Sequence, residues 1–237
     1  MKRLATVTLY SVAMGYLEGA LVIYIREMIF GNPIQVFPLR LLQPQLGAME
    51  VGREIATVIM LATVGYLAGR ERTERWLFFV YAFAVWDLVY YLTLKSLVGW
   101  PPSLLTPDVL FLIPVIWIGP VIAPIMIALL LGGTSMMLLR LGTIGAAVQF
   151  RPINIWLFIA GCIPVLYSFT GKIFYILIYR SPKGLENYVP QGFTWLPFFI
   201  GYIMMSFAAL RALTESYHKM RSQPPDPTGA DKKEVIR

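Results

Sequence analysis

The chain alternates long apolar runs with short segments that contain charged residues, proline or glycine. About six of these runs reach ~20 residues, the length that an α-helix needs to cross the hydrocarbon core of a bilayer. The predicted spans cover residues 4–30, 46–69, 76–98, 120–139, 153–179 and 195–213. The pattern therefore predicts an all-α fold, a polytopic transmembrane helical bundle of about six spans.

One apolar stretch, residues 104–141, is too long for a single span and is interrupted by prolines. Pro114 and Pro120 each remove a backbone donor and clash with the preceding helical turn. We expect a short helix over 108–117 that lies at the interface or re-enters the membrane, outside any straight transmembrane helix. The break at 118–120 is a second place to look for function, because irregular backbone at membrane depth must be covered by protein or line a water cavity.

Composition supports the same class of protein. Hydrophobic residues make up 57% of the chain and charged residues 14%, whereas soluble domains carry roughly 25% charged residues. A chain of 237 residues with about six spans leaves no room for a separate globular domain. We expect one transmembrane bundle over residues 1–217 and a disordered cytoplasmic tail over 218–237, which is rich in proline and charge.

Positive charge is distributed unevenly between the two membrane sides of this predicted six-span topology. Most of the 20 Lys and Arg residues fall on the side that carries both termini: Lys2, Arg3, Arg70, Arg72, Arg75, Arg140, Arg151, Arg211, Lys219, Arg221, Lys232, Lys233 and Arg237. The positive-inside rule then predicts a multi-pass protein of the cell (inner or plasma) membrane with both termini in the cytoplasm. The expected partners are the lipid bilayer and other membrane subunits. Nucleic acid is not expected, because no basic patch with stacking aromatics is present.

The second predicted span carries charge where a membrane helix should be apolar. Glu50, Arg53 and Glu54 lie three or four residues apart or side by side near its start, and residues at that spacing are neighbours on a helix surface. With a rise of ~1.5 Å per residue, Glu18 on the first span and Asp87 on the third fall in the same layer of the outer half as Glu54. Such groups are costly there unless they are paired or face a cavity. We expect Arg53 to hold Glu54 and at least one of the other two acids.

Further polar residues extend this layer toward the outer surface. Asp87, Tyr90, Tyr91 and Lys95 fall on one face of the third span, so that a phenol can donate to a carboxylate and Lys95 can reach it from above. Asp108 lies at the same outer level. The candidate binding or proton-relay residues are Glu18, Glu50, Arg53, Glu54, Asp87, Tyr90, Tyr91, Lys95 and Asp108.

A structural interpretation stands beside the functional one. The same acids and Arg53 could simply neutralise each other as a network between three helices. Gly15 and Gly19 bracket Glu18 with a G-x-x-x-G spacing, which allows another helix backbone to approach closely. Both interpretations stay open at the level of sequence.

The residues that are absent narrow the chemistry. The only histidine, His218, lies in the tail, so haem, zinc and di-iron sites with histidine ligands have no donors within the membrane. The sequence contains no Walker loop, no dinucleotide fingerprint and no serine, histidine and aspartate set. A carboxylate site for a hard cation stays open, but Arg53 argues against it, and we predict no metal site. The cofactor is unknown.

Three classes of function remain. The first is a membrane-complex subunit whose buried carboxylates relay protons or bind a small polar ligand. The second is a membrane-embedded enzyme that acts on a lipid, quinone or isoprenoid, with Asp87 or Glu54 as acid or base and Arg53 on an anionic headgroup. The third is a scaffold that packs through its uncharged helices. The lack of a catalytic histidine favours the first class.

Overall fold

The computed structural model describes residues 2–144, 148 and 150–222. Its long helices are α1 Lys2–Phe30, α2 Pro44–Ala68, α3 Arg72–Val98, α4 Ile122–Thr143, α5 Pro152–Tyr179 and α6 Trp195–Ser222. All 6 are long and apolar enough to cross a membrane, so the predicted transmembrane bundle is confirmed. Helix α6 continues past the expected end at residue 213, and residues 223–237 of the predicted tail lie outside the described part.

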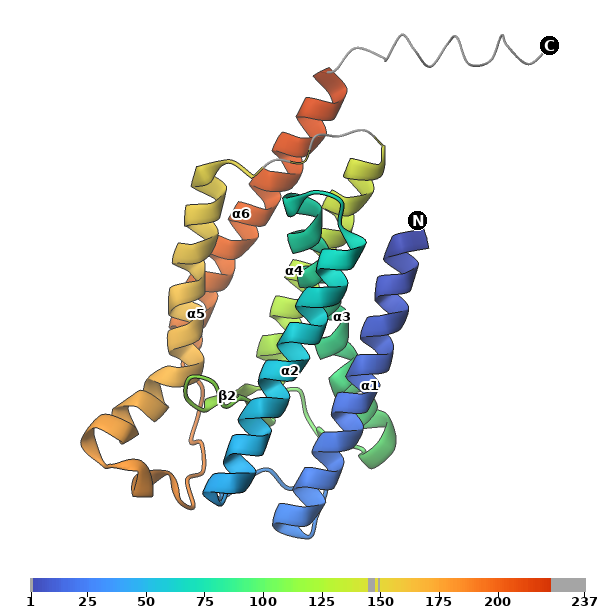
Figure 1. Ribbon diagram of the computed structural model, residues 1–237. Helices are drawn as coiled ribbons and strands as arrows, with labels where there is room; N and C mark the ends of the chain where they lie inside the picture. The colour runs from blue at the N-terminus through green and yellow to red at the C-terminus, as the bar shows by residue number, and fades with distance from the viewer. Residues whose placement is uncertain (1, 145–147, 149, 223–237) are drawn as a thin grey trace, which may run out of the picture.

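Both ends of the described chain lie at the same end of the bundle. Figure 1 shows α1 beginning and α6 ending there, together with the turn between α2 and α3. The connection between α1 and α2 and the loop between α5 and α6 lie at the opposite end (Figure 1). An even number of crossings requires this arrangement, which agrees with the predicted topology. The side of the membrane that each end faces stays a prediction from the charge distribution.

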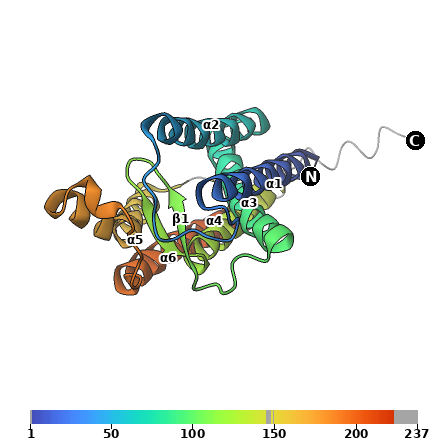
Figure 2. The ribbon, with the colours of Figure 1, turned by 90° about the horizontal axis from the view of Figure 1, so that it is seen from below.

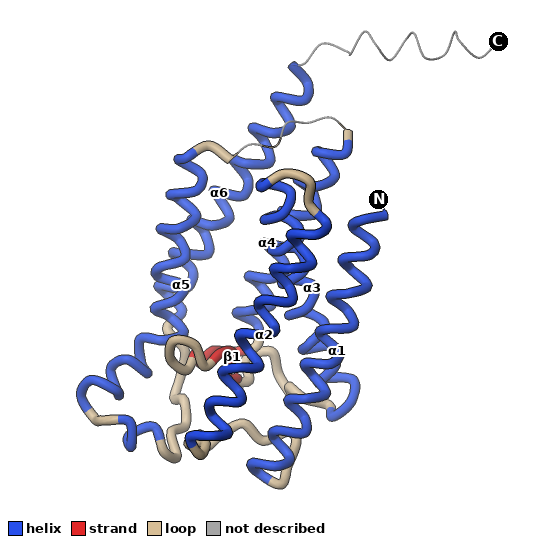
Figure 3. The backbone as a smooth tube through the Cα atoms, viewed as in Figure 1, coloured by secondary structure: helices blue, strands red, loops and turns tan. Residues whose placement is uncertain are grey.

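The proline-rich segment between α3 and α4 is not a short helix, and the prediction for residues 108–117 is wrong. It forms an antiparallel hairpin of β1 Pro107–Phe111 and β2 Trp117–Pro120, with Val109 paired to Ile118. Prolines exclude a regular helix, while the β-branched and aromatic residues between them favour strands. Pairing satisfies backbone groups that would otherwise be exposed within an apolar layer. The prediction that residues 108–119 lie outside a straight transmembrane helix is confirmed (Figure 3).

The hairpin lies inside the outline of the bundle. Viewed from the end opposite the termini, β1 lies between α5 on one side and α1 and α3 on the other (Figure 2). Strand β2 contacts both α4 and α5. The hairpin therefore forms a wall between the first three helices and the last two.

The first and third helices touch through glycine. A Cβ atom added at Gly15 would lie 2.7 Å from the carbonyl oxygen of Trp86, and one at Gly19 would lie 2.8 Å from Cβ of Thr93. Only glycine permits this approach, so the expected role of the G-x-x-x-G spacing is confirmed, with α3 as the partner helix. Glu18, which lies between the two glycines, is thereby held close to α3.

Helix α2 approaches α3 in a similar way, but only near its C-terminal end. A Cβ atom at Gly65 would lie 2.6 Å from the backbone nitrogen of Phe79. The charged residues of α2 lie at its other end, two turns or more from this contact. The position of α2 beside the hairpin therefore depends on other interactions.

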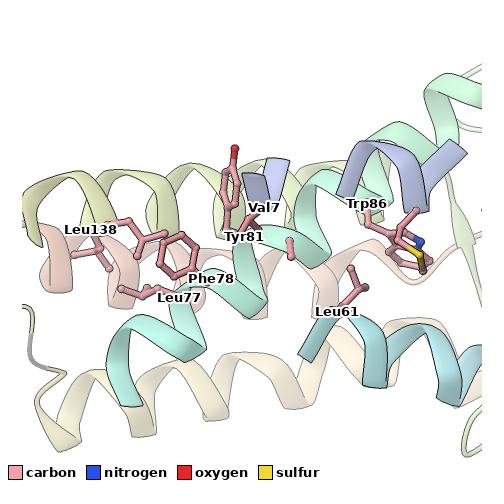
Figure 4. Close-up of a cluster of buried hydrophobic side chains, with 10 residues drawn as sticks. Val7, Leu61, Leu77, Phe78, Tyr81, Trp86 and Leu138 are labelled. Carbon is pink, nitrogen blue, oxygen red and sulfur yellow. The ribbon is translucent and has the colours of Figure 1, made fainter. Parts of the chain in front are cut away.

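The largest apolar cluster lies toward the end with the termini. Val7 of α1, Leu61 of α2, Phe78 of α3 and Leu138 of α4 are all buried within it. Figure 4 shows Phe78 between Leu77 and Leu138, with Val7 near Tyr81. This core holds the first four helices together, and the charged residues of the candidate site lie in the opposite half.

Two connections join at the end opposite the termini. The backbone nitrogen of Leu39 donates to the carbonyl of Tyr188 at 2.8 Å, and the nitrogen of Asn187 donates to the carbonyl of Leu39 at 2.9 Å. The segment between α1 and α2 is therefore tied to the loop between α5 and α6. This segment covers part of the space between the helices.

Candidate functional site

A cavity of about 490 Å³ lies in the charged half of the bundle. It is bordered by α1, α2, α3, the hairpin, α4 and one residue of α5. Its size is typical of pockets for small molecules, which span roughly 300–1,000 Å³. Of the predicted site residues, all except Lys95 line it: Glu18, Glu50, Arg53, Glu54, Asp87, Tyr90, Tyr91 and Asp108.

Arg53 joins α2 to α1 through an ion pair. Its Nη1 contacts Oε1 of Glu18, and its Nε lies 3.0 Å from Oε2 of Glu50, one turn earlier on α2. Thr57 also donates to Glu18, with 3.1 Å between Oγ1 and Oε2. The predicted pair with Glu18 is confirmed.

Among the described residues Arg53 forms no ion pair with Glu54, and that part of the prediction is wrong, whereas Glu18 supplies the one further acid that was expected. Consecutive residues on a helix point in different directions, whereas residues three apart share a face. Arg53 therefore bonds to Glu50, while the next residue, Glu54, reaches another element. Two of the three guanidinium nitrogens of Arg53, Nη1 and Nε, are thus engaged by carboxylates of the protein.

Glu54 joins α2 to the hairpin. Both carboxylate oxygens accept the backbone N–H of Leu112, each at 3.0 Å. Glu54 is buried, and a hydrogen bond to a charged acceptor is stronger than one between neutral groups. This bond sets the distance between the charged end of α2 and the chain that follows β1.

Arg26 and Asp108 form a second ion pair. Nη2 of Arg26 lies 2.9 Å from Oδ1 of Asp108, and the side chains are 7% and 0% exposed. The hydroxyl of Tyr91 donates to Oδ2 at 3.3 Å, and the Arg26 guanidinium lies 4.0 Å from the centre of the Trp100 ring. Burial raises the pKa of Asp108, while Arg26 acts in the opposite direction.

Sequence reasoning missed the role of Arg26. The candidate residues chosen from the sequence do not include it. Arg26 lies eight residues after Glu18, which is two full turns and about 80° further around the helix, so both lie within one broad face of α1. That spacing was the available indication of a second basic residue directed at the cavity.

Lys95 does not belong to the cavity. Its Nζ donates to the carbonyl oxygens of Gly99 at 3.2 Å and Pro101 at 2.9 Å. A lysine in the last turn stabilises carbonyl groups that have no helical partner. Lys95 thus stabilises the end of α3 instead of reaching Asp87.

Asp87 differs from the other acids of the cavity. Within residues 2–144, 148 and 150–222, its carboxyl group makes no hydrogen bond and no ion pair. The arginines that could neutralise it are engaged by Glu18, Glu50 and Asp108. Asp87 is therefore available to a molecule in the cavity.

Three N–H groups at the cavity are also without protein partners. Nη1 of Arg26 and the indole nitrogens of Trp86 and Trp117 are buried and make no hydrogen bond, and all three residues line the cavity. Buried polar groups are nearly always paired in folded proteins. Among the described residues, these donors and the Asp87 carboxyl therefore have unused hydrogen-bonding capacity on side chains that border the cavity.

Other side chains of the lining are aromatic and aliphatic. Phe111 of β1 packs against Trp117 of β2 with ring centres 5.6 Å apart, and Trp117 stacks on Phe169 of α5 at 6.2 Å. Ile127 and Leu131 of α4 line the same cavity. The cavity therefore combines hydrogen-bonding groups with hydrocarbon surface.

The described residues do not bring three or more histidine, cysteine or acidic side chains together as a metal site would require. Comparison with protein-family models, with curated proteins and with solved structures gives no match. The functional argument therefore depends on the cavity itself.

Proposed function

We propose that the protein binds a small amphipathic molecule inside the membrane, in the cavity between α1 to α4 and the hairpin. One observation supports this proposal most directly. Four residues that line the cavity have polar groups without a hydrogen-bond partner among the described residues, namely the Asp87 carboxyl and the N–H groups of Arg26, Trp86 and Trp117. Each buried group without a partner costs ~1–3 kcal/mol. A molecule with a hydroxyl or carbonyl group would supply the missing partners.

The charges of the cavity favour a neutral polar end over an anionic headgroup. Acids outnumber bases among the lining residues: Glu18, Glu50, Glu54, Asp87 and Asp108 against Arg26, Arg40 and Arg53. Like charges brought together repel, and the penalty grows where water is scarce. A phosphate or carboxylate would therefore be repelled, whereas an alcohol can donate to Asp87 and accept from an indole, and a ketone can accept from an indole.

The remainder of the ligand is expected to be hydrocarbon. The hairpin and α4 offer aromatic and aliphatic side chains to it, and apolar surface removed from water contributes ~25 cal/mol per Å². Lipids and isoprenoids with one polar end combine both properties. The roles of proton-relay subunit and of scaffold stay predictions drawn from the sequence.

Bound molecules extracted from purified protein test this proposal. Leu131→Trp would fill the cavity from α4, while Leu129→Trp places the same side chain on the same helix at a position that is 58% exposed and outside the cavity. Native mass spectrometry should show a retained small molecule in the wild type and in Leu129→Trp, and its loss in Leu131→Trp. Equal retention by all three proteins would contradict the proposal.

We also propose that both termini face the cytoplasm, which places the cavity in the outer half of the membrane. The excess of Lys and Arg at that end supports this orientation. The test is labelling of Asn187→Cys in a chain whose single Cys162 has been replaced. An impermeant thiol reagent should label intact cells, and labelling restricted to inside-out vesicles would reverse the orientation.

A further inference from the structure

Asp87 stands at one end of a line of aromatic rings. Phe83 lies four residues before it on α3, so the two side chains share a face of the helix, and both line the cavity. The Phe83 ring stacks on Phe111 of β1, with centres 6.3 Å apart and planes 13° apart. An acid group without a protein partner is thus placed beside the start of an aromatic surface.

The line of rings continues away from Asp87 across the hairpin. From Phe111 it passes to Trp117 at 5.6 Å and then to Phe169 at 6.2 Å. We call Phe83, Phe111, Trp117 and Phe169 the aromatic wall. Within the described part of the chain, no Arg or Lys lies over any ring of this wall. No protein cation therefore competes with a cation of the ligand for the ring faces that are not covered by a neighbouring ring.

The acids of the cavity divide into two kinds. Glu18, Glu50 and Asp108 are paired with arginine, and Glu54 accepts the backbone N–H of Leu112, and such contacts stabilise the charged carboxylate. Asp87 has no such partner among the described residues, and an isolated carboxylate in an apolar environment is so costly that the neutral acid is the stable form. Asp87 is therefore the acid of this cavity that has a proton to give.

From this arrangement we propose that Asp87 protonates a carbon–carbon double bond of an isoprenoid held in the cavity, and that the aromatic wall stabilises the carbocation. This inference depends on the proposed function and names its substrate class. The π electrons form a C–H bond as the O–H bond of Asp87 breaks, which leaves a cation on the neighbouring carbon and a carboxylate on Asp87. A neighbouring C–H bond then returns its proton to Asp87, and its electrons form a new double bond.

The net reaction is an isomerisation, or a cyclisation when a second double bond attacks the cation. The acid is regenerated, and no oxidant, reductant or cofactor is consumed. Water would capture the cation, so the reaction needs a cavity from which water is largely excluded. The apolar side chains of α4 and the hairpin shield one side of the cavity.

The experiment uses the full chain in lipid nanodiscs with geranylgeraniol, an isoprenoid alcohol, in heavy water. Binding is measured first, by native mass spectrometry, and the deuterium content and double-bond positions of the recovered alcohol are measured next. The wild type should bind the alcohol and introduce deuterium well above nanodiscs without protein. Asp87→Asn should still bind but lose at least about 100-fold in the rate of deuterium incorporation.

Two further variants separate the chemistry from structural effects. Glu27→Gln makes the same change from acid to amide on an exposed side chain outside the cavity, and it should bind and exchange as the wild type does. Phe111→Leu keeps the apolar volume but removes one face of the aromatic wall, and it should slow exchange about tenfold while binding persists.

Each result bears on a different step. Binding without deuterium incorporation in the wild type overturns the acid chemistry and leaves the proposed binding function standing. Exchange that Asp87→Asn leaves unchanged overturns the role of Asp87. No binding of geranylgeraniol overturns the isoprenoid class, while retention of the native molecule in the Leu129→Trp and Leu131→Trp comparison still judges the binding function by itself.

Discussion

The two halves of the bundle are held together by different forces. Near the termini, Val7, Leu61, Phe78 and Leu138 form a dry core without charged members. In the opposite half, the helices are joined by the ion pairs of Arg26 and Arg53, which surround a cavity. Apolar packing tolerates small shifts, whereas ion pairs require defined partners. The comparison teaches that the first half is stabilised by apolar packing, whereas the second is stabilised by ion pairs that also position polar groups around the cavity.

The largest expected effect on stability is in the polar half. Arg26→Ala would leave Asp108 fully buried without its partner, and we expect a loss of ~3–5 kcal/mol in the free energy of unfolding. Unfolding in mixed detergent micelles, followed by circular dichroism, measures it. The double variant Arg26→Met with Asp108→Asn should recover much of the loss. If the single change costs no more than the double change, the ion pair does not hold this half together.

The next effect is in the apolar half. Leu61 is 0% exposed, and Leu61→Ala should cost ~2–4 kcal/mol through lost packing and a new cavity. The same unfolding measurement applies, with Leu67→Ala at an exposed position of α2 as the control. Ligand retention should not change in Leu61→Ala at temperatures where it is folded. A selective loss of ligand would show that the two halves are not independent.

Arg53→Ala should have a smaller effect than Arg26→Ala. Its side chain is 21% exposed, and Glu18 keeps the hydrogen bond from Thr57 when the arginine is removed. We expect a loss of ~2–3 kcal/mol in the free energy of unfolding. A loss as large as that of Arg26→Ala would mean that both ion pairs are equally isolated from water, and the ranking within this half would be wrong.

The smallest effect on stability is expected at Asp87. Asp87→Asn removes a carboxyl group that has no protein partner, so the free energy of unfolding should change by no more than ~0.5 kcal/mol. The same change should leave the ligand bound, because the amide oxygen of asparagine still accepts a hydrogen bond from a ligand hydroxyl. A clear loss of stability would show that Asp87 supports the fold. It would then favour the interpretation in which the buried acids only hold the helices together.

The sequence predicted the helices well because each is a long apolar run, and the glycine pair correctly marked the contact between α1 and α3. The hairpin was not predicted, since a run of apolar residues broken by Pro114 and Pro120 fits both a broken helix and a pair of strands. What decides between them is the pairing of Val109 with Ile118, which is visible only when both segments are placed in space.

The sequence predicted most of the residues that line the cavity, but few of the contacts that these residues make with each other. The common layer of Glu18, Glu54 and Asp87 was predicted from their depth in the membrane, which follows from the fixed rise per residue along a helix. The rotation of each helix about its axis is set by packing, and so the pair between Arg26 and Asp108, 82 positions apart, could not be derived. The partner of Glu54 is the backbone N–H of Leu112. Every residue except proline has such a group, so the sequence does not indicate which residue Glu54 will contact.

The contact of Gly65 with Phe79 has a consequence for how the protein can move. It fixes α2 against α3 near one end, where no side chain separates the two backbones. Toward the other end, α2 is joined to its neighbours by the bonds of Arg53 and Glu54. A helix held in this way has its pivot at Gly65, so that a small rotation there becomes a displacement of several ångströms at the charged end. A displacement that admits a molecule from the surrounding lipid therefore requires the polar bonds of Arg53, Glu54 and Thr57 to break, while the apolar core stays intact.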